Sequence, residues 1–193
     1  ITKDITGAEK SNSIAYFNDL GKNIQNHTVD KKTNRTWVSQ TLYDSEGRPA
    51  LNTLSAPIGN YNGEFTYSNE FIHDANNSFY TNTDFESDPE NPSPVGSNQN
   101  TLGRYYSSEN TNSFHEGNNY QDITSYPFSR TIYSKLNPGK VLKTLGGNKI
   151  NGEWKQDYTF TMIASDELAQ SGAFNSTSYN QTNREITKTV TRD

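Results

Sequence analysis

The chain has 193 residues, no cysteine and a formal net charge of −5, and 30% of its residues are hydrophobic. This length suits one domain or one piece of a larger protein. The lack of cysteine excludes a disulfide scaffold, the negative charge argues against a nucleic-acid binder, and no apolar run approaches the ~20 residues of a membrane span. The chain opens without Met or an apolar leader, so we expect an excerpt of a longer protein or a processed chain.

The first part, residues 1–59, is expected to form β-hairpins. Residues Thr36 to Tyr43 are rich in β-formers and contain neither Gly nor Pro, which is typical of a strand. This strand is expected to stop at the turn-forming sequence Asp44-Ser45-Glu46-Gly47. Pro49 follows, so another strand can begin there only at an edge or at its first residue.

The middle part, residues 60–125, is irregular and rich in both Asn and aromatic residues. Runs such as Asn76-Asn77-Ser78 and the proline-containing segment 88–94 are typical of loops. Tyr and Phe nevertheless recur throughout, and a structureless loop of this length is unusual inside a domain. We expect a long excursion that lays its aromatic side chains on a neighbouring surface.

The last part, residues 126–193, is expected to contain further strands. One is predicted at residues 141–145, ended by Gly146-Gly147, and another at residues 185–191. Residues 165–170 could form one helical turn. The alternation over residues 154–162 predicts a strand with one buried face and one wet face. The predicted buried face carries Trp154, Gln156, Tyr158, Phe160 and Met162.

A turn motif recurs, with an aromatic residue, an Asx residue, two variable positions, Gly and a basic residue. The Asx side chain can bond the turn backbone, and Gly can adopt the positive φ that other residues resist. The aromatic residue is expected to pack at the end of a strand. The third copy is degenerate, with Ser in place of Asx and a longer turn. The motif residues are Phe17, Asn18, Gly21 and Lys22; Tyr43, Asp44, Gly47 and Arg48; and Tyr133, Ser134, Gly139 and Lys140.

These motifs resemble the YD repeats of Rhs-type proteins. The best match is the heptapeptide from Tyr43 to Pro49, Tyr-Asp-Ser-Glu-Gly-Arg-Pro. The runs 126–133, 137–143 and 187–193 are similar to the region that precedes the main repeat core in large Rhs/YD proteins of Bacteroidota. The resemblance covers roughly residues 13–54 and 126–193.

The resemblance implies an all-β fold of antiparallel hairpins that form part of a larger sheet or shell. It also implies a non-catalytic, structural segment of a secreted or cell-surface bacterial protein with no cofactor. Many members of the family carry a C-terminal toxin elsewhere in the polypeptide. Its partners would be the rest of that polypeptide, neighbouring β-repeats, secretion machinery or a cell surface. Type IX export is common in such proteins, but its C-terminal signal does not occur here, which leaves the export route open. The alternative is an extracellular β-sandwich that binds glycan or a cell-surface partner through the aromatic excursion. Replacement of Tyr105 and Tyr106 by Ala should then abolish binding and leave the fold intact.

Other residues offer weaker candidates for chemistry. His27, expected near a strand end, and His73 and His115 show no metal-binding spacing. No nucleophile elbow or phosphate-binding loop is present, so no catalytic residue can be named. Trp37 and Trp154 could line a sugar-binding face, but a place in the core is the favoured interpretation.

Two polar patterns remain. Asp84, Glu86, Asp88 and Glu90 could offer oxygens to Ca²⁺, but Pro89 stands where an EF-hand loop needs Gly, and we favour a solvated acidic loop. Five Asn-x-Ser/Thr sequons occur, and several are expected by chance because the chain is rich in Asn, Ser and Thr. We expect them to carry no glycan. They begin at Asn26, Asn34, Asn76, Asn175 and Asn180.

Overall fold

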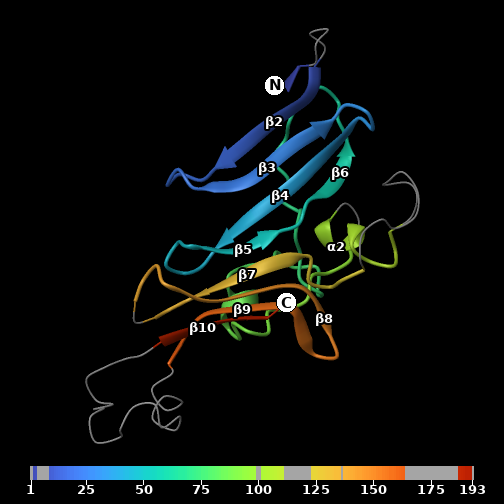
Figure 1. The fold of residues 1–193 in the computed structure, drawn as a ribbon. Coiled ribbons are helices and arrows are strands. Elements are labelled where there is room, and N and C mark those ends of the chain that lie inside the picture. Colours follow the sequence, from blue (N-terminus) through green and yellow to red (C-terminus); the bar gives the residue numbers. More distant parts are fainter. Residues whose placement is uncertain are drawn as a thin grey trace, which may run out of the picture.

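The computed structural model describes residues 2–3, 9–98, 101–110, 123–135, 137–163 and 187–192. Within these residues ten strands pair antiparallel in one sheet (Figure 1), which confirms the predicted all-β, antiparallel fold class. The described residues contain two helices, each a single turn: α1 (Thr83–Glu86) and α2 (Leu102–Tyr105).

The sheet is largely a meander, in which neighbours in sequence are neighbours in space. The order across it is β1-β2-β3-β4-β5-β7-β8-β9-β10, and β6 pairs with β4. The strands are β1 (Thr2–Lys3), β2 (Glu9–Phe17), β3 (Asn23–Asp30), β4 (Arg35–Tyr43), β5 (Pro49–Thr53), β6 (Ala56–Asn60), β7 (Phe128–Tyr133), β8 (Val141–Ile150), β9 (Glu153–Ile163) and β10 (Thr187–Arg192).

Strand β4 joins the two halves of the sheet. One end of β4 pairs with β5, where Leu42 lies opposite Leu51, and the other pairs with β6, where Val38 lies opposite Ala56. The far side of β5 then pairs with β7. Proline stands at the first residue of β5, as predicted, where its missing N–H is tolerated. The chain therefore leaves the sheet after β6 and returns to it at β7, on the other side of β5.

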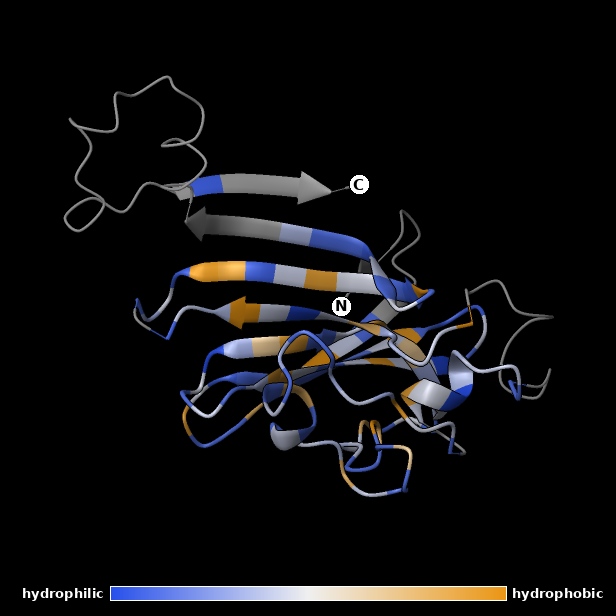
Figure 2. Ribbon diagram, turned by 90° about the horizontal axis from the view of Figure 1, so that it is seen from below, coloured by the Kyte–Doolittle hydropathy of each residue, from blue (hydrophilic) through white to orange (hydrophobic). Residues whose placement is uncertain are grey.

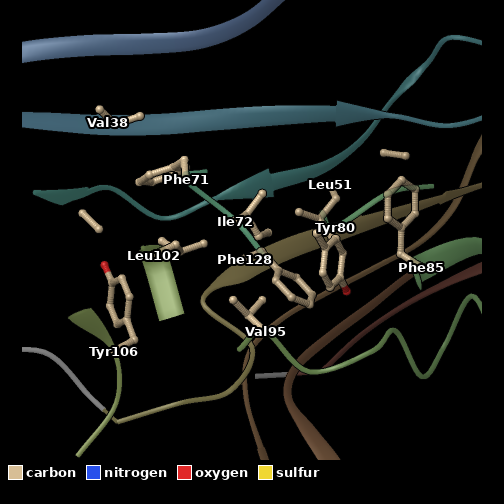
Figure 3. Packing of buried hydrophobic residues seen from close by; sticks show 12 residues of the cluster. Val38, Leu51, Phe71, Ile72, Tyr80, Phe85, Val95, Leu102, Tyr106 and Phe128 are labelled. Atoms are coloured by element: carbon tan, nitrogen blue, oxygen red, sulfur yellow. The ribbon is translucent and has the colours of Figure 1, made fainter. Parts of the chain in front are cut away.

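The irregular segment between β6 and β7 supplies most of the core. It lies against one side of the sheet (Figure 2), and its apolar side chains meet those of the central strands (Figure 3). Phe71 and Phe85 from this segment and Phe128 from β7 are among the largest fully buried side chains, each worth about 2–3 kcal/mol of transfer free energy. The expectation that this segment lays aromatic residues on a neighbouring surface is confirmed.

Within this segment the backbone packs so closely that two positions require glycine. A Cβ atom on Gly103 would overlap the carbonyl oxygen of Gly96, and one on Gly96 would overlap the carbonyl oxygen of Asp74. The amide of Gly96 donates to the carbonyl of His73 at 2.9 Å. Three stretches of irregular backbone are thus held in direct contact beneath the sheet.

Two predictions for the last part were wrong. Strand β8 does not stop at Gly146-Gly147. It continues to Ile150 through a register shift after Gly146, which Gly147 accommodates with a φ of +78°. In β9, Gln156 is exposed, and Trp154 is only half-buried where it packs against Tyr126 and the core cluster, so the predicted face is buried only in part.

Some predicted features lie outside the described side chains or residues. The faces of Phe160 and Met162 and the helical turn at residues 165–170 belong to this group. The last predicted strand is present as β10, which pairs with β9 from Thr187 to Arg192.

Candidate functional site

The first two copies of the turn motif adopt the same hydrogen-bonded structure. Asn18 Oδ1 accepts from the amides of Leu20 and Lys22 at 3.1 and 2.9 Å. Asp44 Oδ1 accepts from the amides of Glu46 and Arg48 at 3.0 and 2.8 Å. In each turn the glycine amide also donates to the carbonyl of the Asx residue, at 2.9 Å.

Glycine is required in both turns by its backbone conformation. Gly21 and Gly47 have φ values of +73° and +75°, in the left-handed region that side chains disfavour. The geometry therefore matches the physical reasons given from the sequence for the Asx and Gly positions. The expectation that the aromatic residue packs was wrong for Phe17, which is 59% exposed.

The degenerate third copy keeps the same pattern around two extra residues. Ser134 Oγ accepts from the amide of Asn137 at 3.0 Å, and the Ser134 amide donates to the carbonyl of Lys140 at 2.9 Å. Gly139 has a φ of +90°. A hydroxyl thus takes the place of the Asx carboxylate or amide.

A fourth copy, which the sequence analysis missed, lies in the irregular segment at Asp74. Asp74 Oδ1 accepts from the amides of Asn76 and Ser78 at 2.9 and 2.8 Å. Asn77 takes the glycine position with a φ of +66°, which Asn tolerates better than most residues. In the sequence this copy is recognisable from His73 before Asp74 and Asn77 three residues after it. His73 takes the place of the aromatic residue of the motif, and Asn77 takes the place of Gly.

The three motif turns of the sheet are linked to each other side by side. Lys22 Nζ donates to the carbonyl of Gly47 at 2.6 Å and lies 5.4 Å from the ring centroid of Tyr43. The Tyr43 hydroxyl donates back to the carbonyl of Asn23 at 2.6 Å. The basic residue of one turn therefore meets the aromatic residue of the next turn. In return, the tyrosine hydroxyl donates to the backbone carbonyl of the residue that follows the basic residue.

The same exchange is repeated one hairpin further along. The Arg48 guanidinium lies 4.6 Å from the ring centroid of Tyr133, and the Tyr133 hydroxyl donates to the carbonyl of Pro49 at 3.0 Å. We call these paired contacts, Lys22 with Tyr43 and Arg48 with Tyr133, the turn ladder. Each cation–aromatic contact contributes about 0.5–1 kcal/mol at an exposed position.

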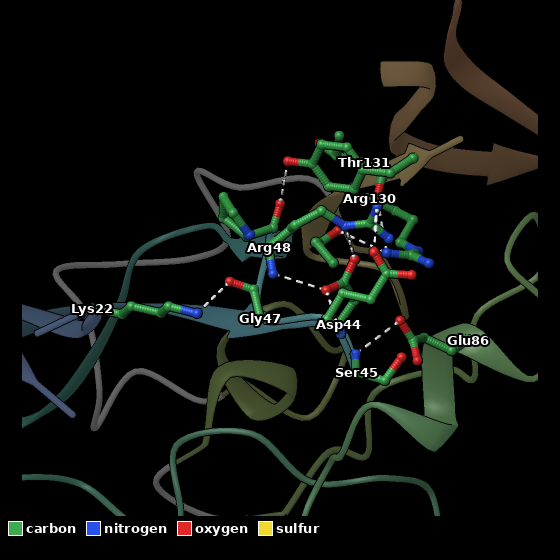
Figure 4. A network of polar contacts seen from close by, with 12 residues as sticks. Lys22, Asp44, Ser45, Gly47, Arg48, Glu86, Arg130 and Thr131 are labelled. Carbon is green, nitrogen blue, oxygen red and sulfur yellow. Dashed lines mark hydrogen bonds and ion pairs between the residues drawn. The ribbon is translucent and has the colours of Figure 1, made fainter. Parts of the chain in front are cut away.

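The middle turn is the most buried and the most charged (Figure 4). The Asp44 side chain is 3% exposed and accepts from Arg48 Nε at 2.7 Å. Glu86 of α1 accepts from the Ser45 amide at 3.3 Å, which ties the irregular segment to this turn.

A buried cation, Arg130 of β7, lies behind the middle turn. Its Nη1 donates to the carbonyls of Ala50 and Thr131, and its guanidinium lies 4.7 Å from the ring centroid of Phe85. Burial lowers the pKa of Arg130, although an arginine still remains protonated in a protein. The motif did not identify this residue, because it lies in the middle of a strand.

His27 makes a structural contact. His27 lies in the middle of β3, not near its end as expected, and is fully buried. His27 Nε2 pairs with Gln25 Oε1 at 2.6 Å, and Gln25 also bonds the backbone N and O of Ser68. Burial lowers the pKa of His27 to about 4. This pair pins the irregular segment to the sheet; His115 lies outside the described residues.

The acidic run does not gather into a cation site. Asp84 accepts from Thr81, Glu86 from Ser45, Asp88 from Asn91, and Glu90 pairs with Lys143 at 3.0 Å. Among the described residues no group of three or more His, Asp or Glu side chains could hold a metal ion. The carboxylates serve four separate local contacts.

The aromatic residues considered for sugar binding pack mainly on each other. Trp37 meets Tyr105 edge-on at 5.6 Å, and Trp154 meets Tyr126 at 5.2 Å. Tyr106 is buried in the core, and its hydroxyl donates to the carbonyl of Ser55 at 2.9 Å. The binding alternative needs Tyr106 at the surface, but the residue belongs to the core.

The sequons are only partly within the described chain. Asn26, Asn34 and Asn76 are exposed, on β3, in the β3–β4 turn and in the Asp74 turn. Asn175 and Asn180 lie outside the described residues.

Comparisons with known proteins bear on the first half of the chain. No curated protein and no solved structure matches. No helix in the described part of the chain is long and apolar enough to cross a membrane. Residues 2–94, which contain β1 to β6, the first two motif turns and the Asp74 turn, match the family model described as a domain of unknown function, DUF6443.

Proposed function

We propose that this chain is a non-catalytic structural segment of a secreted or cell-surface bacterial protein of the Rhs/YD-repeat type, and that its sheet is one piece of a larger sheet or shell. The turn ladder is the observation that carries this proposal. Its contacts join each hairpin to the next, as a repeat architecture requires when single units cannot bury a core alone.

The outer edge of the sheet supports continuation beyond β2. Strand β1 pairs with β2 at Glu9 and Ser11, and no described strand pairs with the outer edge of β2 from Ser13 to Phe17. Unpaired edges of this kind are sites of further strand pairing.

Phe17, at the end of this edge, has no basic side chain over its ring among the described residues. It holds the position that Tyr43 and Tyr133 hold in the other turns, yet its side chain is 59% exposed. By the rule of the ladder, a basic residue of a preceding hairpin would lie over this ring. The partner proposed for this edge is therefore another hairpin of the same polypeptide.

The location and the wider role rest on the resemblance to Rhs/YD proteins. On that basis we propose that the rest of the polypeptide could house a C-terminal toxin, that secretion machinery or a cell surface could be further partners, and that type IX export is one route among others.

Intact mass spectrometry with peptide mapping of the native protein tests this proposal. We expect peptides of this chain in the secreted or surface fraction, within a longer polypeptide that carries many more Tyr-Asp-x-x-Gly-Arg turns. Recovery of this chain from the cytoplasm, or within a polypeptide without further turns of this kind, would contradict it.

A further inference from the structure

We propose that a cavity beside the Asp74 turn binds a sugar ring, namely a neutral hexopyranose at the end of a glycan. The cavity has a volume of about 400 Å³, which lies within the range of small-molecule sites. Its lining residues are Glu70, His73, Asn77, Ser78, Phe79, Asn98 and Thr101.

The cavity contains a rigid aromatic platform. The rings of His73 and Phe79 stack with centroids 5.4 Å apart and planes 22° apart. The two residues face each other as a β-bridge across the Asp74 turn, which fixes their backbones. Phe79 is nevertheless 60% exposed, while His73 is 7% exposed. A flat aromatic face left open above a buried ring suits the C–H face of a pyranose.

The polar lining favours a neutral polyol. Among the described lining residues, Glu70 carries the one full negative charge and none is Lys or Arg, whereas a phosphate or sulfate ligand would call for cations. The hydroxyl groups of a sugar could donate to Glu70 and bond the side-chain amides of Asn77 and Asn98.

This turn departs from the other copies at the positions that would link it to a neighbouring turn. Asn77 replaces Gly and Ser78 replaces the basic residue, and both line the cavity. Phe79 stands where the ladder turns have Asn23 and Pro49, whose carbonyls accept the tyrosine hydroxyls. The same backbone frame therefore presents a different set of side chains, held in place by the Asp74 bonds before any ligand arrives.

Saturation-transfer NMR and titration calorimetry on the full chain test this site. The probes are the methyl glycosides of glucose, galactose, mannose, N-acetylglucosamine and fucose. The variants are Phe79→Ala and Glu70→Gln, with Ile150→Ala as the control because Ile150 is an equally exposed apolar side chain at the β8–β9 turn. Circular dichroism confirms that each variant is folded.

We expect at least one glycoside to bind, with affinity about tenfold or more lower in Phe79→Ala, since loss of an aromatic stack costs on the order of that factor. Glu70→Gln should also weaken binding, and Ile150→Ala should leave it unchanged. Absence of binding to all five glycosides would overturn the proposal. Equal binding by folded Phe79→Ala and the parent chain would overturn the location.

Discussion

Replacement of the Asx residue should cost far more in the second turn than in the first. Asp44 and Asn18 make the same two backbone hydrogen bonds, but Asp44 is buried and also accepts from Arg48 Nε at 2.7 Å. Asp44→Ala leaves two amides and a guanidinium without their acceptor, and we expect a loss of about 3 kcal/mol in the free energy of unfolding. Asn18→Ala exposes two amides to water in an open turn and should cost about 1 kcal/mol.

Asp44→Asn separates the two contributions at the buried turn. The amide oxygen can still accept the backbone bonds, but the charge that faces Arg48 is gone, so we expect a loss of about 2 kcal/mol. Urea unfolding at pH 7, followed by the fluorescence of Trp37 and Trp154, measures all three variants. Equal losses for Asp44→Ala and Asn18→Ala, at unchanged m-value, would refute the argument that burial and the Arg48 pair distinguish these turns.

Three further predictions concern backbone conformation and pH. Gly21→Ala should cost about 1 kcal/mol from its positive φ alone, and Gly47→Ala more, because its Cβ would also displace Lys22 from the Gly47 carbonyl; the two melting temperatures, compared directly, check the order. Gly103→Ala should lower stability by more than about 2 kcal/mol and loosen the irregular segment, because its Cβ would overlap backbone that cannot move aside; limited proteolysis of that segment should then accelerate, and unchanged cleavage would contradict the close approach. The pKa of His27 is lowered from 6.5 to about 4, so His27 binds a proton more readily in the unfolded chain. The free energy of unfolding should therefore be unaffected by this group above pH 6.5 and should fall by up to about 3 kcal/mol as the pH drops to 4. His27→Gln, which keeps a polar side chain at that position, should flatten stability between pH 6.5 and 4, and identical pH profiles of the variant and the parent would contradict the shift.

The sequence predicted the local structure of the sheet better than its extent. The strand at Thr36 to Tyr43, the turn after it and the start of a strand at Pro49 all follow from residue types over short distances. Strand β8 was cut short because Gly146-Gly147 usually ends a strand, whereas here one glycine takes a positive φ inside a register shift.

The long-range contacts could not be derived from local patterns. The alternation of residues 154–162 placed Trp154 on a buried face, but Trp154 is half-buried. How deeply it is buried depends on the position of the irregular segment, which the alternation does not reveal. The turn motif gave the internal bonds of each turn. The contact of Arg48 with Tyr133 exists only because β7 pairs with β5, after an excursion of more than 60 residues.

Amide hydrogen exchange along β2 tests the central proposal most directly. The measurement compares the segment from Ser13 to Phe17 in the isolated chain and in the native polypeptide, by mass spectrometry. If a preceding hairpin pairs with this edge, amides that exchange rapidly in the isolated chain will be protected in the native polypeptide. Equal and rapid exchange of these amides in both would contradict a sheet that continues beyond β2.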